Sequence, residues 1–254
     1  MRTLCLFAAL AVLVVARPAG AATPPSALDL VRAAEIHRGV FPDTGIEWTV
    51  AAKSEGEAEA KEATLLVRTQ NGRSLAEITA PSSSKGKKYL LADGSMYFYR
   101  PGTSRPVSVP TRQQVAGDAA IGDIASTSFL VEYAPAAAEP GTHQGERCTV
   151  LQLDAKKGLT VSASYSQIKL WISERDRVIR KAEFYTKTGR LIRTALFFYK
   201  SNLSYDGKSI PFLSSLQVVQ QLGMPKTTTL HFSEFKLKSF PMALFSKDSL
   251  AGNS

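Results

Sequence analysis

Apolar and polar residues alternate along most of the chain from residue 45 to residue 236. Residues 45–50 and 63–69 alternate as half-buried strands do, and Asn71-Gly72 supplies the positive φ that a hairpin turn onto residues 73–79 requires. Further strands are predicted at residues 88–91, 95–99, 148–154, 166–173, 177–185, 191–200, 214–220 and 227–236. The pattern predicts an antiparallel sheet of about ten strands, which tends to curl into a barrel or half-barrel.

Two stretches depart from this alternation. Ser26 is expected to cap a short amphipathic helix over residues 27–37, where apolar residues recur at helical spacing. Within residues 107–139, residues 121–133 resemble a helical or irregular segment and residues 135–141 a Pro/Ala-rich surface loop. This stretch is either a mobile lid or a plain long connection, and the pattern favours neither.

Large side chains occupy both faces of several predicted strands. Residues 96–99 are Met-Tyr-Phe-Tyr, and residues 197–199 are Phe-Phe-Tyr. A sheet with one face in water would show polar residues at alternate positions, so both faces of these strands are expected to be covered. The sequence is compatible with an ordinary thick core and with a hydrophobic ligand cavity inside the curled sheet.

The N-terminus has the layout of a cleavable secretory signal. Arg2 precedes an apolar run over residues 4–15, and small residues follow it at 19–22, so cleavage is expected after Ala22 or Ala21. The apolar run is about a dozen residues long, whereas a bilayer-spanning helix needs roughly 20. We therefore predict a signal peptide over residues 1–22, followed by a single exported domain over residues 23–254.

The exported part carries a modest positive charge. Arg2 and Arg17 lie in the predicted signal, so 29 of the 31 basic residues remain against 22 acidic ones, a net charge of +7. Outside the cytoplasm this excess favours lipid head groups over nucleic acid as an anionic partner, although solubilising surface charge explains most of it equally well. Cys148 is the one cysteine left after cleavage, so no intramolecular disulfide is predicted.

The sequence contains no local signature of catalysis or metal binding. It lacks H-E-x-x-H, C-x-x-C, G-x-S-x-G and a Gly-rich phosphate loop, the motifs of zinc, thiol-redox, serine-hydrolase and nucleotide chemistry. No catalytic residue, metal ion or cofactor is therefore predicted, although catalytic groups that assemble only in the folded chain leave no such spacing.

Three segments resemble a known family. Residues 86–107 contain a Lys-Lys-Tyr strand, a turn, the aromatic strand Met-Tyr-Phe-Tyr and the sequence Pro-Gly-x-x-Arg. With residues 116–129 and the closing Phe-Pro-x-x-Leu-Phe at residues 240–245, they resemble the LolA-like outer-membrane lipoprotein-sorting proteins over most of residues 28–250. Met96 stands where this family usually has Trp, and Gly117-Asp118 and Gly122-Asp123 replace its Gly-Ser-Asp element, which indicates a divergent member.

The resemblance implies a mainly β fold, a curled antiparallel sheet that forms an incomplete barrel closed by helices. It also implies a periplasmic carrier that accepts the acyl chains of a lipid or lipoprotein from an inner-membrane transporter of the ABC or RND type. The carrier would deliver them to an outer-membrane acceptor. Burying an acyl chain is worth about 0.8 kcal/mol per methylene, so such a carrier needs an apolar cavity and no cofactor.

Candidate ligand contacts follow from this interpretation. The residues expected to line the lipid cavity are Trp48, Leu65, Val67, Ile78, Leu91, Met96, Phe98, Phe184, Leu196 and Phe198. The arginines expected to contact head groups or to latch a lid are Arg68, Arg100, Arg105 and Arg112, for which a solvated charge at a strand end is the alternative.

Two other functions are compatible with the sequence. The same half-barrel would serve a periplasmic lipid or lipoprotein sensor that binds a signalling partner, or a small-molecule enzyme built around the cavity. A carrier passes labelled lipid to an acceptor membrane, whereas a sensor need only bind it. An enzyme would lose turnover when one polar cavity residue is changed.

Overall fold

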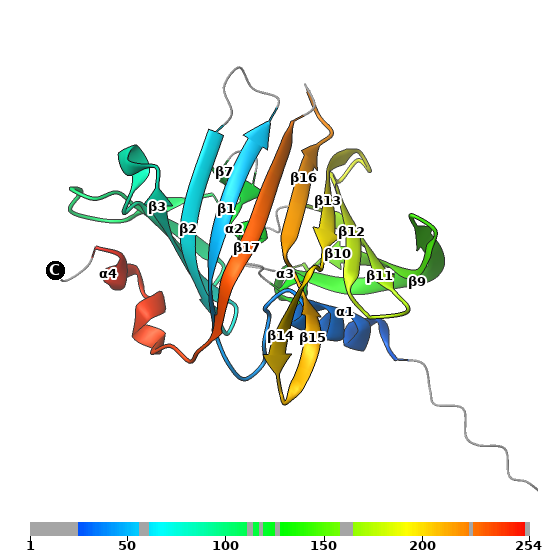
Figure 1. Ribbon diagram of the computed structural model, residues 1–254. Helices are drawn as coiled ribbons and strands as arrows, with labels where there is room; N and C mark the ends of the chain where they lie inside the picture. Colours follow the sequence, from blue (N-terminus) through cyan, green and yellow to red (C-terminus); the bar gives the residue numbers. More distant parts are fainter. Residues whose placement is uncertain are drawn as a thin grey trace, which may run out of the picture.

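The computed structural model describes residues 25–55, 61–110, 114–116, 119–124, 128–157, 165–223 and 226–251. The predicted signal peptide and Arg112 lie outside these residues. The chain folds into a large curved sheet, with α1 and the β14–β15 hairpin on one side of it and α4 near the far end (Figure 1). The helices and strands are α1 (Ala27–Ile36), β1 (Ile46–Glu55), β2 (Lys61–Gln70), β3 (Arg73–Ala80), η1 (Ser82–Ser84), β4 (Lys88–Ala92), β5 (Ser95–Tyr99), β6 (Val107–Val109), β7 (Gln114–Ala116), β8 (Ala119–Ala120), α2 (Ile121–Ile124), α3 (Phe129–Glu132), β9 (Tyr133–His143), β10 (Glu146–Ala155), β11 (Gln167–Ser173), β12 (Ile179–Tyr185), β13 (Leu191–Phe198), β14 (Ser201–Tyr205), β15 (Lys208–Phe212), β16 (Ser215–Gln220), β17 (Thr227–Leu237), η2 (Met242–Phe245) and α4 (Lys247–Leu250).

Thirteen strands form one sheet in the order β6-β5-β4-β3-β2-β1-β17-β16-β13-β12-β11-β10-β9. β1 pairs antiparallel with β17, so segments from the two ends of the chain meet in the middle of the sheet. The edge strands β6 and β9 do not pair with each other, so the sheet stays open. The predicted fold class, a mainly β chain with a few helices and an incomplete barrel, is confirmed.

Local signals in the first half predicted their elements well. The Ser26 side chain accepts a hydrogen bond from the Asp29 amide at 3.2 Å and begins α1 where the sequence placed it. Asn71 and Gly72 have φ values of 51° and 72°, as the hairpin between β2 and β3 requires.

Two predictions about connecting segments were wrong. Residues 135–141, predicted as a surface loop, lie in β9 and pair with β10. An edge strand pairs on one side only, so it accommodates Pro135 and Pro140, which lack an N–H to donate. Residues 201–212 are the second case: no strand was predicted there, but the short, largely polar β14 and β15 form a hairpin.

Both faces of the sheet are covered near β3 and β4. On the inner face, Trp48, Val67 and Ala76 lie side by side across β1, β2 and β3 and are almost inaccessible to water. On the outer face, Leu75 and Leu90 pack against the C-terminal segment through Phe240, Phe245 and Leu250. Full burial of each such side chain is worth about 1.5–3 kcal/mol, so the C-terminal segment contributes to the stability of the sheet.

Gly39 fixes the end of α1 against the sheet. Its amide donates to the Ile36 carbonyl at 3.1 Å and the Val40 amide donates to the Glu35 carbonyl at 3.1 Å, the Schellman pattern of a helix C-terminus. Gly39 has φ +89°, and a Cβ placed there would lie 2.3 Å from the Trp48 ring. Both the backbone conformation and the space therefore require glycine.

Gly39→Ala is expected to destabilise the protein more than Gly94→Ala, which has φ +75° but open space around its Cβ position. The left-handed backbone alone costs about 1–2 kcal/mol in each variant, and overpacking against Trp48 adds about 1–3 kcal/mol at Gly39. Urea unfolding of both variants measures the difference. Equal losses would contradict the close contact between Gly39 and Trp48.

Candidate functional site: the interior beneath α1 and α3

Most of the predicted cavity residues share the inner face of the sheet. Trp48, Leu65, Val67, Ile78, Met96 and Phe184 are at most 4% exposed, and half-buried Leu91 and Phe98 pack against the same core. In this conformation the six buried side chains contact protein rather than open space. A ligand that reaches them must therefore displace part of the cover.

Leu196 and Phe198 lie on the other face. They alternate along β13 with Ala195 and Phe197, which belong to the inner core, so their side chains point outward. Both line a surface pocket of about 320 Å³ together with Arg180. The expectation that they share one cavity with Trp48 therefore does not fit the strand register.

The predicted arginines are spread over the surface. Arg68 lies opposite Glu47 on the outer face, and its Nε donates to the Glu47 carboxylate at 2.7 Å. Arg100 and Arg105 are exposed near the end of β5. None of these three lines the pocket beside α1 and α3.

α1 places two charged side chains in the interior. Val31, Ala34, Glu35 and Arg38 follow one another at i, i+3, i+4 and i+7 and form the buried side of the helix and its C-terminal turn. Glu35 is 2% exposed and Arg38 is 3% exposed. Sequence reasoning did not single out either residue, although this spacing places both on the apolar side of the helix.

Glu35 connects α1 to α3. Its carboxylate accepts hydrogen bonds from the Ser128 hydroxyl at 2.7 Å and from the Phe129 amide at 2.5 Å, and the Ser128 hydroxyl in turn accepts from the Leu130 amide. Burial raises the pKa of Glu35, while Arg38 and these hydrogen bonds oppose the rise. One buried carboxylate therefore holds the start of α3 over the interior.

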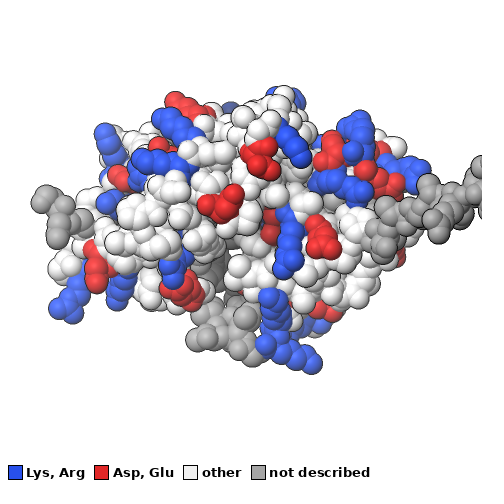
Figure 2. Space-filling view, turned by 90° about the horizontal axis from the view of Figure 1, so that it is seen from below, with Lys and Arg blue, Asp and Glu red and all other residues white. Residues whose placement is uncertain are grey.

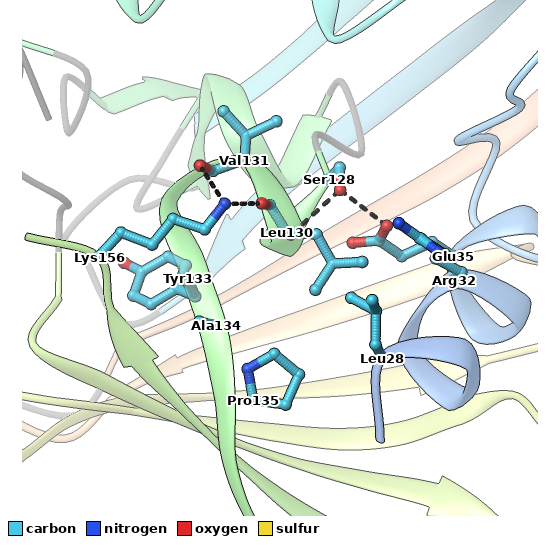
Figure 3. Close-up of a pocket in the computed structure, with 10 residues that line it drawn as sticks. All are labelled: Leu28, Arg32, Glu35, Ser128, Leu130, Val131, Tyr133, Ala134, Pro135 and Lys156. Atoms are coloured by element: carbon cyan, nitrogen blue, oxygen red, sulfur yellow. Dashed lines mark hydrogen bonds between the residues drawn. The ribbon is translucent and has the colours of Figure 1, made fainter. Parts of the chain in front are cut away.

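A pocket of about 370 Å³ opens beside this contact (Figure 3). Leu28 and Leu130 point toward each other inside it, and the Lys156 ammonium donates to the Leu130 and Val131 carbonyls at 2.7 and 3.3 Å. Leu28 and Val131 are 37% and 51% exposed, so apolar surface lies at the mouth of the pocket. The remaining lining residues are Arg32, Glu35, Ser128, Tyr133, Ala134 and Pro135.

A second buried arginine lies on β13. Arg193 binds Asp123 of α2 through two hydrogen bonds of 2.7 and 2.9 Å, and its guanidinium lies 4.3 Å from the centre of the Phe184 ring. Asp123 belongs to the Gly-Asp sequence that replaces the expected Gly-Ser-Asp element. This ion pair ties α2 to the inner face of the sheet.

Within the described ranges, no group of three or more His, Cys, Asp or Glu side chains is arranged to hold a metal ion. The helices of these ranges are all too short or too polar to span a bilayer. Cys148 is buried in β10.

Comparisons with known proteins place this fold in a family. Residues 70–252 match the sequence model of a family described as an uncharacterized protein. A LolA superfamily protein from Nitrosomonas europaea has a similar structure, with a TM-score of 0.76, 26% sequence identity and coverage of 89% of this chain and 99% of that one. The chain belongs to the family of that sequence model. It is a divergent LolA-like protein.

Two further structures share the LolA-like fold. An outer-membrane lipoprotein-sorting protein domain from Vibrio parahaemolyticus, described as putative, has a TM-score of 0.72 at 16% identity, with coverage of 89% of this chain and 98% of that one. A DUF1329 family protein from Desulfovibrio piger has a TM-score of 0.69 at 18% identity, with coverage of 87% and 96%. No curated protein matches the sequence.

Glu35→Ala is expected to release α3. The variant loses two hydrogen bonds to a charged acceptor, each worth about 1.5–3 kcal/mol, whereas Ser128→Ala loses one of them. Hydrogen exchange at the Phe129 amide is therefore expected to accelerate strongly in Glu35→Ala and less in Ser128→Ala. The control is Glu47→Ala, which removes a carboxylate paired on the outer face and should leave that amide protected.

The raised pKa of Glu35 predicts that the stability of the protein depends on pH. Its folded pKa lies above the ordinary value of 4.5, so the folded chain keeps this proton to a higher pH than the unfolded chain. The contribution of Glu35 to stability is therefore largest below its unfolded pKa and falls as the pH rises through its folded pKa. The unfolding free energy of the wild type minus that of Glu35→Gln, measured by urea titration from pH 4 to 8, should decrease with pH, and a flat or rising difference would refute the assignment.

Proposed function

We propose that this protein is a periplasmic carrier of acyl chains. It takes up a lipid or the acyl chains of a lipoprotein inside the curved sheet and transfers them from the inner to the outer membrane. One observation carries the proposal: Phe129 and Leu130 of α3 cover part of the apolar inner core, and Glu35 holds this four-residue helix through two hydrogen bonds.

The energies of opening and binding are of similar size. Breaking both hydrogen bonds to Glu35 costs about 3–6 kcal/mol at the magnitudes typical of charged acceptors. An acyl chain returns about 0.8 kcal/mol per methylene moved out of water, so about four to eight methylenes offset the loss. A long acyl chain exceeds this length, whereas a small apolar molecule does not.

The proposed path begins at the pocket between α1 and β9. Leu28 and Val131 offer exposed apolar surface at its mouth beside half-buried Leu130, and displacement of α3 would then expose the inner face behind it. The chain would lie against Trp48, Leu65, Val67, Ile78, Leu91, Met96, Phe98 and Phe184. Arg100 and Arg105 remain proposed contacts for head groups or membranes outside the barrel.

Partners and location follow from the same proposal. The signal peptide over residues 1–22 exports a single domain, an inner-membrane transporter of the ABC or RND type loads it, and an outer-membrane acceptor unloads it. The lipoprotein-sorting description of one structural relative supports this. Lys and Arg alternate with Asp and Glu on the face shown in Figure 2, so that face offers no continuous basic stripe for nucleic acid.

Lipid recovery and transfer test the carrier. Protein purified from native periplasm under mild conditions should yield acyl lipids on organic extraction and mass spectrometry. Purified protein should also move labelled lipid from donor to acceptor vesicles. Glu35→Ala should take up lipid faster than the wild type because α3 opens more readily. Glu47→Ala should take up lipid at the wild-type rate. Binding without transfer would favour the sensor, and the absence of both lipid and binding would refute the carrier.

A further inference from the structure

Arg38 is buried in the interior, and two of its nitrogens find no hydrogen-bond acceptor among the described residues. The residue is 3% exposed, and its Nε and Nη1 are enclosed with no partner. No hydrogen bond or ion pair joins its side chain to the described residues. A buried cation with unsatisfied N–H groups is costly, so its presence needs an explanation.

The groups around Arg38 do not satisfy it. Its guanidinium lies 4.4 Å from the centre of the Phe129 ring and 5.4 Å from that of Phe197, and aromatic faces attract a cation but accept no strong hydrogen bond. The titratable neighbours are Glu35, Tyr199 and Asp123, and the Tyr199 hydroxyl makes no hydrogen bond to Arg38. Glu35 accepts from Ser128 and Phe129, and Asp123 is engaged by both terminal nitrogens of Arg193.

The backbone holds Arg38 in this position. Arg38 lies between α1 and Gly39, whose Schellman turn and contact with Trp48 fix the chain direction. The preceding residue, His37, is anchored on both sides: its ring bonds the Pro211 carbonyl at 2.7 Å, and its carbonyl accepts from the Leu213 amide at 3.0 Å. The anchored backbone keeps the Cα and Cβ of Arg38 in the interior.

We propose that Arg38 binds the anionic head group of an amphiphilic cargo, a carboxylate or phosphate attached to an acyl chain. The inference rests on the proposed carrier function and narrows its cargo. A guanidinium presents paired N–H donors that match the oxygens of both anions, and the unpaired Nε and Nη1 are such donors.

The position of Phe129 connects head-group binding to opening. Its ring covers the Arg38 guanidinium, and its amide is one of the two groups that Glu35 holds. Displacement of α3 therefore removes Phe129 from Arg38 and opens the inner face at the same time. The adjacent pocket of about 370 Å³ opens to the surface and is lined by Glu35 and Ser128, the two side chains whose hydrogen bond holds the start of α3.

Isothermal titration with matched probes tests the proposal. Dodecanoate and dodecyl phosphate carry an anionic group on the same chain as dodecanol, and inorganic phosphate carries the anion without a chain. The anionic amphiphiles are expected to bind the wild type at least tenfold more tightly than dodecanol. Arg38→Met should reduce their affinity to that of dodecanol and leave dodecanol binding unchanged.

Matched variants separate binding from folding. Arg100→Met and Arg105→Met remove exposed arginines and should retain the preference for anionic probes. Arg38→Met leaves Glu35 without its cationic neighbour and for that reason could fail to fold. In that case the double variant Arg38→Met/Glu35→Gln, which removes both charges, replaces Arg38→Met in the titration. Arg38→Lys keeps the charge without the paired donors and should show an intermediate preference.

Each outcome decides a different point. Equal affinity for dodecanoate and dodecanol overturns the head-group site and leaves the carrier function intact. Binding of inorganic phosphate as tight as that of dodecyl phosphate shows a site for free anions and overturns the amphiphile. Failure of every probe with a chain to bind refutes the carrier itself.

Discussion

The need to keep the inner face of an open sheet away from water governs this structure. A closed barrel covers its interior by its own strands, whereas the edges β6 and β9 remain apart here. Separate elements must therefore cover the face, and α1, α3 and the β14–β15 hairpin do so. α3 is only four residues long, and it is held by Phe129 and Leu130 packing against the core and by hydrogen bonds to Glu35 and Lys156 at the mouth of the pocket.

The two interior arginines show how differently a buried charge can be treated. Arg193 has a bidentate carboxylate partner and ties α2 to the sheet, which is the arrangement expected of a structural ion pair. Arg38 has aromatic neighbours and enclosed nitrogens without acceptors. The enclosed nitrogens without acceptors cost stability, so the presence of Arg38 favours a role in binding.

The sequence predicted the sheet because alternation and turn chemistry are local. The Asn71-Gly72 turn and the Ser26 cap each depend on a few neighbouring residues, and both were correct. The interior site depends on contacts between distant segments: Glu35 meets Ser128, and Asp123 meets Arg193. The sequence also could not predict which face of the sheet Leu196 and Phe198 occupy. Both faces of β13 carry apolar residues, so the alternation does not show which residues point inward.

Because α3 covers both a charged group and an apolar surface, its displacement gives a physical basis for ligand selectivity. α3 shields Arg38 through Phe129 and the hydrocarbon face behind it, so any ligand that displaces α3 must offset the same opening cost. A neutral acyl chain offsets this cost only by hydrophobic contacts with the inner face. A free anion offsets it only by polar contacts with Arg38. An amphiphile with both gains the two contributions for one opening cost. In the proposed carrier, the hydrogen bonds of Glu35 to α3 would therefore favour cargo that carries an anion on an acyl chain.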